Sequence, residues 1–558
     1  MAPHRDIGVG VVASGFVQLL LSQLSTRIIS FALNLLIARH LSPEAYGLSS
    51  VQFHLITTTT LLLSREGLRR GCLRLKPNSG SVEASQVLSV AWLVLPSGVL
   101  VCTAVTGITL AVAGTGADDA YRQGVLLHAL AAMIELAAEP LYILALVNLR
   151  FQLRATIDTV SLLLKSALTL YLVSHSALPP ATIFSLAQLA YACAVLVAYA
   201  AAVGGEAVAG LRQARRSRSG HALWGPEERG AVWMSAIFSL QAAEKQVLAE
   251  GSKFVLAGMQ SSYNQGVYGL VANLGSLVVR TLFQPLEEIA FAAFSRFQVS
   301  INASKEADAL AKKTAAADGG DGDGGGVERM AQVLSLLVRL VCLLGLASTC
   351  FGPPYAYTLV RLVYGTKWSE TEAPAVLAVY ATYILLLAVN GVTEAFVHAV
   401  LDARGLSQIN ALLVAFAVVH VAASAGAVSA AGAVGLVAAD AANMALRIVS
   451  SLWYIRRQFR SLPSFRLSQL SPRPATLAAF AAAGLAALAS QRALVSGARA
   501  LTQRAFLRAA ACHVGVGAAL LACLAVVLYR TERVTLRGLR ALSDERRQGG
   551  GGAKDKDQ

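Results

Sequence analysis

The feature that most constrains this chain is a series of fourteen apolar segments, each close to the ~20 residues that a helix needs to cross a bilayer. With 55% hydrophobic and only 14% charged residues, the chain of 558 residues is too apolar for a soluble protein. The segments lie at about 11–37, 45–64, 86–112, 124–148, 156–174, 180–203, 231–258, 265–290, 331–352, 373–400, 407–424, 430–454, 475–491 and 506–529. The sequence therefore predicts an all-α polytopic membrane protein with about fourteen transmembrane helices. We expect two pseudo-symmetric six-helix halves followed by a C-terminal helix pair.

Polar stretches between these segments divide the chain into parts. The glycine-rich stretch from Asp318 to Gly326 has the composition of a flexible linker, and the last residues have that of a disordered tail. The predicted parts are an N-terminal six-helix lobe (1–205), a basic cytosolic loop (206–230), a C-terminal six-helix lobe (231–455) with a flexible Gly-rich cytosolic linker (301–330), a C-terminal helix pair (456–530) and a disordered basic cytosolic tail (531–558).

The placement of basic residues predicts the orientation of the chain in the membrane. The net charge is +15, and the arginines and lysines gather in alternate connections between the apolar segments. Because cytosolic loops carry the excess of basic residues, we expect both termini and the loops at 204–230 and 301–330 to be cytosolic. The C-terminal Lys554-Asp555-Lys556-Asp557-Gln558 resembles the cytosolic dilysine signal of endoplasmic reticulum (ER) membrane proteins.

A partial internal repeat links the two halves. Tyr46-Gly47-Leu48 recurs as Tyr268-Gly269-Leu270, 222 residues later, and the same offset places Glu66 opposite Glu288. The second copy begins the stretch from Gln265 to Glu288, which contains one arginine, Arg280, well inside an apolar segment. Internal repeats of this kind are how many transporters are built.

Signatures of an enzyme are absent from the sequence. It contains no Walker GKS or GKT motif, no HExxH, no GxSxG and no metal-spaced group of His and Cys. The seven cysteines show no CxxC spacing. We therefore expect no catalytic residue, no metal site, no cofactor and no nucleic-acid partner, and a chain of this kind that transports must use a gradient.

Ionisable residues at membrane depth are the remaining candidates for function, because a charged side chain is costly in lipid. Any one of them has a structural explanation, since long side chains near helix ends extend to the interface. Six of the thirteen lie on the first, seventh and eighth segments, which belong to the leading pairs of the two halves. They are Arg27, Glu135, Glu139, Asp158, Lys165, Glu244, Lys245, Glu250, Lys253, Arg280, Glu394, Asp440 and Arg447.

Several short motifs carry a resemblance to a known family. They are Arg65-Glu66 with Arg69-Arg70 and Cys72, Glu135, Glu139-Pro140, Glu250-Gly251, Gln265-Gly266-Val267-Tyr268, Asn273-Leu274-Gly275-Ser276-Leu277-Val278, Arg280, Phe283-Gln284-Pro285, Glu287-Glu288 and Asn390-Gly391-Val392-Thr393-Glu394. On these residues the chain resembles the Rft ("requiring fifty-three") family of ER membrane proteins, within the multidrug/oligosaccharidyl-lipid/polysaccharide flippase superfamily. It departs from the family at Gly67-Leu68, where a bulkier pair is usual, and in the glycine-rich linker.

The resemblance implies a flippase that moves the dolichol-pyrophosphate-linked oligosaccharide from the cytosolic to the lumenal leaflet of the ER for protein N-glycosylation. The implied partners are this glycolipid, membrane lipids and other enzymes of the N-glycan precursor pathway. Arginine suits a diphosphate because its planar fork donates paired, charge-assisted hydrogen bonds. The candidates for binding the diphosphate and the glycan are Arg27, Arg65, Arg69, Arg70, Lys245, Asn273, Arg280 and Gln284.

Two other functions remain open at this point. One is a non-transporting ER accessory protein of the same pathway, and the other is a cation-coupled exporter of small molecules with Glu250 or Glu394 as the coupling carboxylate. The candidates for gating or coupling are Glu66, Glu250, Glu287, Glu288 and Glu394. One hypothesis for the gate pairs the basic Arg69 and Arg70 with Glu287 and Glu288 at the cytosolic helix ends.

Overall fold

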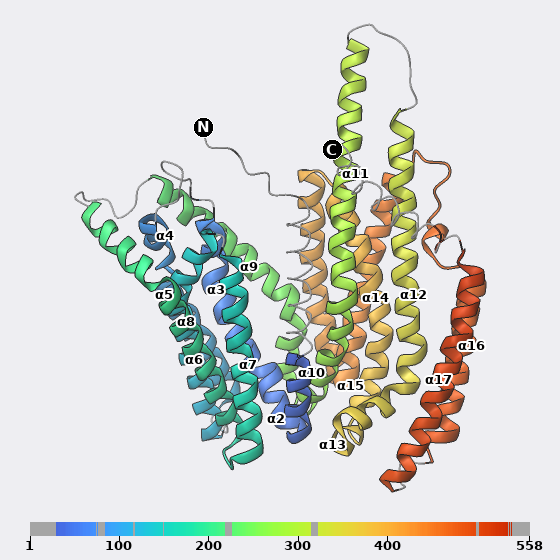
Figure 1. Cartoon of the computed structure of the whole chain (residues 1–558), viewed down its shortest axis with the longest axis horizontal. Coiled ribbons are helices and arrows are strands. Elements are labelled where there is room, and N and C mark those ends of the chain that lie inside the picture. Colours follow the sequence, from blue (N-terminus) through green and yellow to red (C-terminus); the bar gives the residue numbers. More distant parts are fainter. Residues whose placement is uncertain are drawn as a thin grey trace, which may run out of the picture. The chain divides into compact units, whose positions relative to one another are not determined.

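The computed structural model describes residues 29–73, 75, 84–114, 118–148, 150–217, 226–313, 322–497, 502–533, 535 and 537. Every regular element in these ranges is a helix (Figure 1). Ten of the described helices are long and apolar enough to cross a membrane. The prediction of an all-α polytopic membrane protein is therefore confirmed.

The chain divides into two compact units, Met1–Leu270 and Val271–Gln558. The first unit begins, in the described residues, with an apolar helix, Ile29–His40. Its further elements are α2 (Pro43–Gly47), a π-helical segment (Leu48–Phe53), α3 (His54–Cys72), α4 (Ala84–Ala91), α5 (Val94–Ala113), α6 (Asp119–Val147), α7 (Phe151–His175), α8 (Pro180–Ser217), α9 (Pro226–Met259) and the start of α10 (Ser262–Val278).

The core of the first unit lies where α3, α4, α6 and α8 meet. Val87, Leu88, Leu136 and Ile143 are fully buried there, and Tyr199 of α8 packs edge-on against Tyr142 of α6. Helix α6 has 29 residues, which corresponds to about 43 Å at a rise of ~1.5 Å per residue, so it is long enough to cross the membrane. Two glutamates are buried on the same helix, and they define the site described below.

Helix α9 packs along α3 at unusually close range. A side chain built on Gly67 would lie 2.1 Å from the Ser239 hydroxyl, and one built on Gly71 would lie 1.9 Å from the Ser235 hydroxyl. The departure from the family at Gly67 thus has a local reason, because only glycine permits this approach. As a result the first compact unit extends to Leu270, whereas the predicted N-terminal lobe ends at 205.

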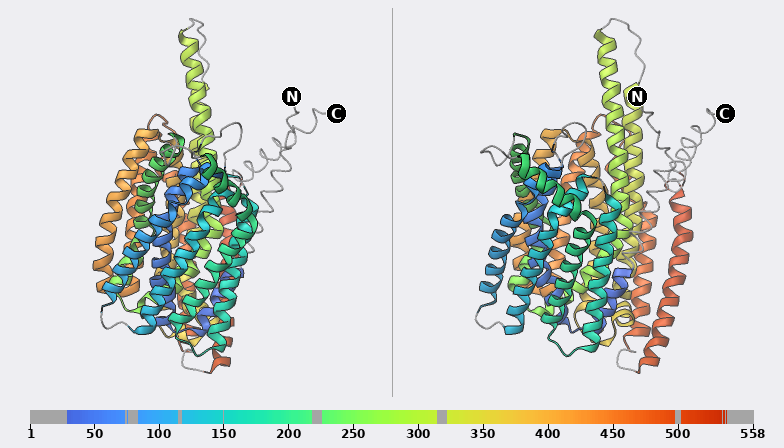
Figure 2. Two further views of the ribbon diagram at one scale, coloured as in Figure 1. Left: turned by 90° about the vertical axis from the view of Figure 1, so that its left-hand side faces the viewer. Right: turned by 60° about the vertical axis from the view of Figure 1, so that its left-hand side comes forward.

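The second unit is built from longer helices. Its elements are the rest of α10, a π-helical segment (Val279–Phe283), α11 (Gln284–Lys313), α12 (Gly322–Tyr364), α13 (Thr366–Ser369), α14 (Ala373–Val400), α15 (Ala403–Gln458), a 3₁₀ turn (Leu467–Leu470), α16 (Pro474–Ser490), a π-helical segment (Gln491–Val495) and α17 (Gln503–Thr531). Figure 2 shows α11 and α12 continuing side by side past the other helices of this unit.

The element α15 is two helices joined by a tight turn. Ala431 and Gly432 have non-helical dihedral angles, and Gly432 has a φ of 54°. His420 and Asp440 are hydrogen-bonded at 2.9 Å, although twenty residues of continuous helix would separate them by ~30 Å. The chain therefore reverses at Gly432, between the predicted segments 407–424 and 430–454.

The C-terminal pair α16 and α17 docks on α12 through one buried histidine. His513 is fully buried, its ring stacks on Tyr355 with centroids 4.0 Å apart, and its backbone oxygen accepts a hydrogen bond from the Tyr355 hydroxyl. Its Nε2 donates to the Pro354 carbonyl oxygen at 3.1 Å, because a carbonyl can only accept. Nδ1 then accepts from the Ser490 hydroxyl at 2.9 Å, so this contact ties α16, α17 and α12 together.

Candidate functional site

The most extensive charged cluster of the first unit joins α3 to α6. Arg65 Nη1 donates to Glu135 Oε1 at 2.8 Å. Arg69 holds Glu139 with two hydrogen bonds, one from Nε and one from Nη2 to Oε2 at 2.8 Å. The Glu139 side chain is only 3% exposed and that of Arg69 is 16% exposed. Arg65 Nη1 also lies 3.8 Å from Glu139 Oε2, so Glu139 has both arginines as ion-pair partners. A carboxylate this deeply buried must be paired to stay charged.

The geometry of this cluster follows from matched spacing on two helices. Residues four apart lie on the same face of a helix, so Arg65 and Arg69 share one face of α3, while Glu135 and Glu139 share one face of α6. Each arginine is separated from its glutamate by 70 residues. Sequence reasoning singled out these four residues but did not pair them, although the equal spacing was a usable signal.

Aromatic rings complete the wall around the ion pairs. The Arg69 guanidinium carbon lies 3.8 Å from the centre of the Tyr142 ring, and that of Arg154 lies 5.1 Å from it. The pairs line a cavity of about 240 Å³ together with Tyr191 and Tyr199. A cation over an aromatic face is stabilised further when it is shielded from water. This cluster therefore fixes α3 firmly against α6.

These contacts bear on the predicted roles of the α3 arginines. Arg65 and Arg69 hold buried glutamates of α6, and Arg70 pairs with Glu66 of its own helix at 2.6 Å. To bind a diphosphate, Arg65 or Arg69 would have to leave a buried carboxylate. Their role as ligands stays a prediction, and so does the gate that pairs Arg69 and Arg70 with Glu287 and Glu288.

A second set of polar contacts lies between α3, α9 and α10. Gln52 Nε2 donates to Gln265 Oε1 at 2.9 Å, and Gln246 Nε2 donates to the Thr59 hydroxyl at 3.0 Å. Between these two contacts Glu250 meets His54 at 3.4 Å and Lys253 at 2.8 Å. Glu250 is thus held by basic groups from two helices, and its predicted coupling role stays a prediction. Arg27 and the side chain of Lys245 lie outside the described residues.

The second unit has its own ion pair at membrane depth, between α14 and the second half of α15. Arg447 Nη2 lies 2.6 Å from both carboxylate oxygens of Glu394, and Asn390 Nδ2 donates to Glu394 Oε2 at 2.7 Å. Among the described residues, buried atoms of this pair and of the two residues in contact with it have no hydrogen-bond partner: Asn390 Oδ1, His398 Nε2 and Arg447 Nε. The sequence predicted Glu394 as a gating or coupling residue, whereas Arg447 was predicted only as an ionisable residue at membrane depth.

The predicted residues of the eighth segment lie on α10, the π-helical segment Val279–Phe283 and α11. Arg280 falls inside that π-helical segment, and π-helical turns are frequent at functional sites. Arg280, Gln284 and Glu288 are exposed, while Asn273 and Glu287 are half-buried. An arginine within an apolar span needs water, protein or a ligand around it, and the role of Arg280 as a ligand residue stays a prediction.

The arrangement is suited to holding charge within a membrane. Paired carboxylates and guanidinium groups occur at membrane depth in both units. Among the described residues no group of three or more His, Cys, Asp and Glu could hold a metal ion. Each unit has its own ion pairs between helices, and the second unit also contains the exposed Arg280.

The fold defines an all-α polytopic membrane protein with ion pairs between its helices. The structure is similar to the solved structure described as "Lipid II flippase MurJ, inward closed conformation", with a TM-score of 0.59. The match covers 92% of this chain and 99% of that chain at 10% sequence identity, so it shows a shared fold. The family model described as Rft protein matches residues 12–541, and the chain therefore belongs to the Rft family.

Curated relatives agree with this assignment. The chain is 32% identical over 488 residues to the Mus musculus protein named "Man(5)GlcNAc(2)-PP-dolichol translocation protein RFT1". This alignment covers 83% of this chain and 85% of that protein. It is 30% identical over 476 residues to the Xenopus tropicalis protein of the same name, covering 82% and 84%. The resemblance predicted from the sequence is thus confirmed, and the relatives are named for translocation rather than for a catalysed reaction.

Proposed function

We propose that this chain is an intramembrane glycolipid transporter that moves dolichol-pyrophosphate-linked oligosaccharide from the cytosolic to the lumenal leaflet of the ER for protein N-glycosylation. The observation that carries the proposal is the Rft match over residues 12–541 on a MurJ-like fold. The names of the relatives supply the substrate, Man(5)GlcNAc(2)-PP-dolichol. The charges at membrane depth fit a cargo with a polar head and an apolar tail, because buried charge is retained where a membrane protein handles polar groups.

The proposed topology has fourteen spans with both termini cytosolic. Ten candidate spans are described, and the turn at Gly432 divides one of them into two. Three more helices are available for the remaining crossings: Ile29–His40, α3 and α9. Helix α9 is less apolar than the others because it carries Glu244, Lys245, Glu250 and Lys253. These elements together support fourteen crossings.

The topology predicts where an engineered acceptor for N-glycosylation will be used. An acceptor-bearing loop inserted between α5 and α6, or between α9 and α10, should be glycosylated because both connections face the lumen. The same loop inserted between α8 and α9, within the basic segment 204–230, should remain unmodified. A shift in gel mobility that glycosidase reverses measures the outcome. Modification of the α8–α9 insertion alone would contradict the orientation.

Arg280 is the proposed ligand of the diphosphate. Replacing it with alanine removes a pair of charge-assisted hydrogen bonds, which corresponds to roughly a 10- to 100-fold weaker binding of the glycolipid. Arg280→Lys should recover only part of the affinity, because an ammonium group cannot donate in the planar fork. Arg296→Ala on the exposed face of α11 is the matched control and should bind normally. The measurement is binding of labelled glycolipid to the purified variants.

Reconstitution tests the function itself. The purified protein is placed in liposomes with labelled Man(5)GlcNAc(2)-PP-dolichol, and arrival in the opposite leaflet is followed by accessibility to a lectin. Transfer by the wild-type protein alone, reduced in Arg280→Ala, is the expected result. Binding without transfer would indicate the accessory function instead. Failure of Arg280→Ala to accumulate would show that Arg280 stabilises the fold.

A further inference from the structure

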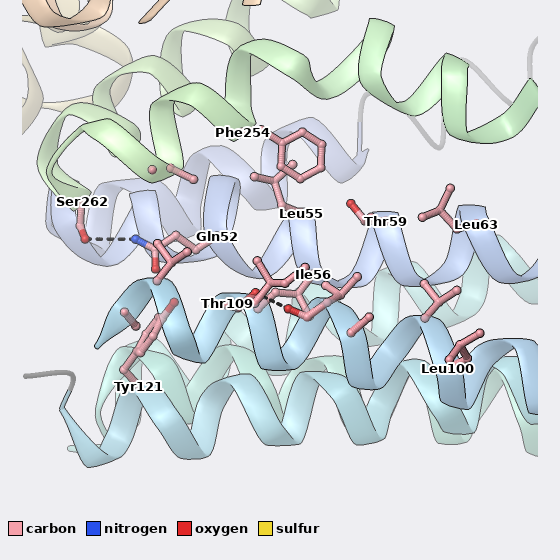
Figure 3. Close-up of a pocket in the computed structure, with 18 residues that line it drawn as sticks. Gln52, Leu55, Ile56, Thr59, Leu63, Leu100, Thr109, Tyr121, Phe254 and Ser262 are labelled. Atoms are coloured by element: carbon pink, nitrogen blue, oxygen red, sulfur yellow. Dashed lines mark hydrogen bonds between the residues drawn. The ribbon is translucent and has the colours of Figure 1, made fainter. Parts of the chain in front are cut away.

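The first unit contains an apolar groove along α3. It has a volume of about 860 Å³, near the upper end of pockets that hold small molecules. Its walls come mainly from α3, α5 and α9, with single residues from the π-helical segment Leu48–Phe53, α6 and α10. Figure 3 shows Gln52, Ser262 and Tyr121 at one end of this groove, and Leu63 and Leu100 at the other. Gln52 and Leu63 are eleven residues apart, so the groove follows about 16 Å of the helix, half of the ~30 Å hydrocarbon core.

Four polar residues of the groove, Gln52, Thr59, Thr109 and Ser262, are already hydrogen-bonded within the protein. Gln52 bonds to Gln265 and Ser262, the Thr59 hydroxyl accepts from Gln246, and the Thr109 hydroxyl donates to a backbone oxygen of its own helix. The remaining wall is almost entirely aliphatic and aromatic. A polar ligand would therefore lose its hydration along most of the groove without gaining hydrogen bonds, whereas a hydrocarbon has no such cost. The occupant that the groove favours is apolar.

The groove also opens sideways and is recessed along its length. Leu100, Ile108 and Val112 of α5 are 73%, 65% and 69% exposed among the described residues, so the groove is open along α5. Small residues interrupt the wall at Ala257 and Gly258, and a side chain built on Gly258 would meet nothing within 4 Å. The groove therefore has room beside Gly258 for an added apolar group.

We propose that this groove holds the polyprenyl tail of the glycolipid cargo during transfer. The inference rests on the proposed function, which supplies a cargo whose tail must stay in an apolar environment while its head crosses the membrane. A groove within the first unit, lined by α3, α5 and α9, keeps one stretch of the tail bound and limits the lateral escape of a partly transferred lipid.

Photolabelling of the purified protein in lipid nanodiscs tests the proposal. The probes are a polyprenyl diphosphate with a diazirine in its tail and a phosphatidylcholine with a diazirine in its acyl chain. Gly258→Leu fills the groove without a clash, and Gly107→Leu on α5 is the matched control, because a side chain at Gly107 also meets nothing within 4 Å but lies outside the groove wall. We expect the polyprenyl probe to label α5 and α9.

The Gly258→Leu change should lower polyprenyl labelling about tenfold, the effect of withdrawing two methylene-sized groups from apolar contact, and Gly107→Leu should leave it unchanged. Equal labelling by the acyl probe, or equal labelling of both variants, would overturn the proposal. A photoreactive residue at position 108 that crosslinks to residues 1–28 of the same chain would also overturn it, because the groove would then be covered by the N-terminal segment.

A short-tailed glycolipid analogue separates this proposal from the proposed function. If both hold, Gly258→Leu weakens binding of the long-tailed glycolipid and leaves the short-tailed analogue unaffected. Glycolipid binding that is indifferent to tail length and to Gly258→Leu refutes the groove alone. If no glycolipid binds while the polyprenyl probe still labels α5 and α9, the groove stands and the proposed function fails.

Discussion

Replacing Glu139 with glutamine should destabilise the first unit severely, by ~3–5 kcal/mol, because the change leaves Arg69 charged, buried and without its carboxylate. The size of the effect follows from burial: the Glu139 side chain is 3% exposed and accepts two hydrogen bonds from one guanidinium group. The fraction of protein that remains monodisperse after heating in detergent, followed by size-exclusion chromatography, measures the loss.

Glu66→Gln is the matched control for this experiment. Glu66 also pairs with an arginine of α3, but the side chains of Glu66 and Arg70 are 28% and 36% exposed. A pair with this much exposure contributes ~0–1 kcal/mol, so the control should melt within a few degrees of the wild type.

A double replacement separates pairing from charge. Arg69→Met combined with Glu139→Leu removes both buried charges and keeps a similar volume, so it should recover most of the stability lost in Glu139→Gln. If the double variant is no more stable than Glu139→Gln, the ion pair is not what the single change disrupts. The prediction would then be wrong.

Breaking the ion pair between Glu394 and Arg447 should abolish accumulation or activity of the protein. A charge swap then distinguishes a structural role of the pair from a role in transfer. Arg447→Gln leaves Glu394 charged at membrane depth, again at a cost of ~3–5 kcal/mol. Glu394→Arg with Arg447→Glu restores opposite charges and should restore accumulation. The swapped protein loses the bond from Asn390 to the carboxylate, because an arginine at position 394 cannot accept it.

We expect this swapped protein to fold and to transfer glycolipid at least about tenfold more slowly, the effect of one lost charge-assisted hydrogen bond. Folding is measured by size-exclusion chromatography and transfer by the liposome assay. Wild-type transfer by the swapped protein would show that the pair only joins α14 to α15, and Glu394 would lose its proposed coupling role. His398→Ala, one turn from Glu394, is a control that leaves both charges in place.

Much of the fold could be predicted from the sequence, because apolar length is a local property of the chain. A run of about 20 apolar residues is costly anywhere but in a membrane, whatever its neighbours are. The turn at Gly432 also lies between two predicted segments, because a straight helix of 56 residues would be far longer than a bilayer is thick. The family resemblance was likewise carried by short, contiguous motifs such as the residues around Arg280.

By itself, the sequence determined which charged side chains need a partner, because an arginine or glutamate inside an apolar segment is costly in lipid wherever the helices lie. Only the tertiary structure decided which partner each one takes. Arg69 meets Glu139 rather than a carboxylate of its own helix because α3 and α6 lie side by side, and Arg70, one residue further around α3, faces Glu66 instead. Helix α9 joined the first unit for a similar reason, because Gly67 and Gly71 allow a close approach that its own sequence does not reveal. Hydrophobicity acts on each segment separately, whereas pairing depends on which helix faces meet, and that is a property of the packed molecule.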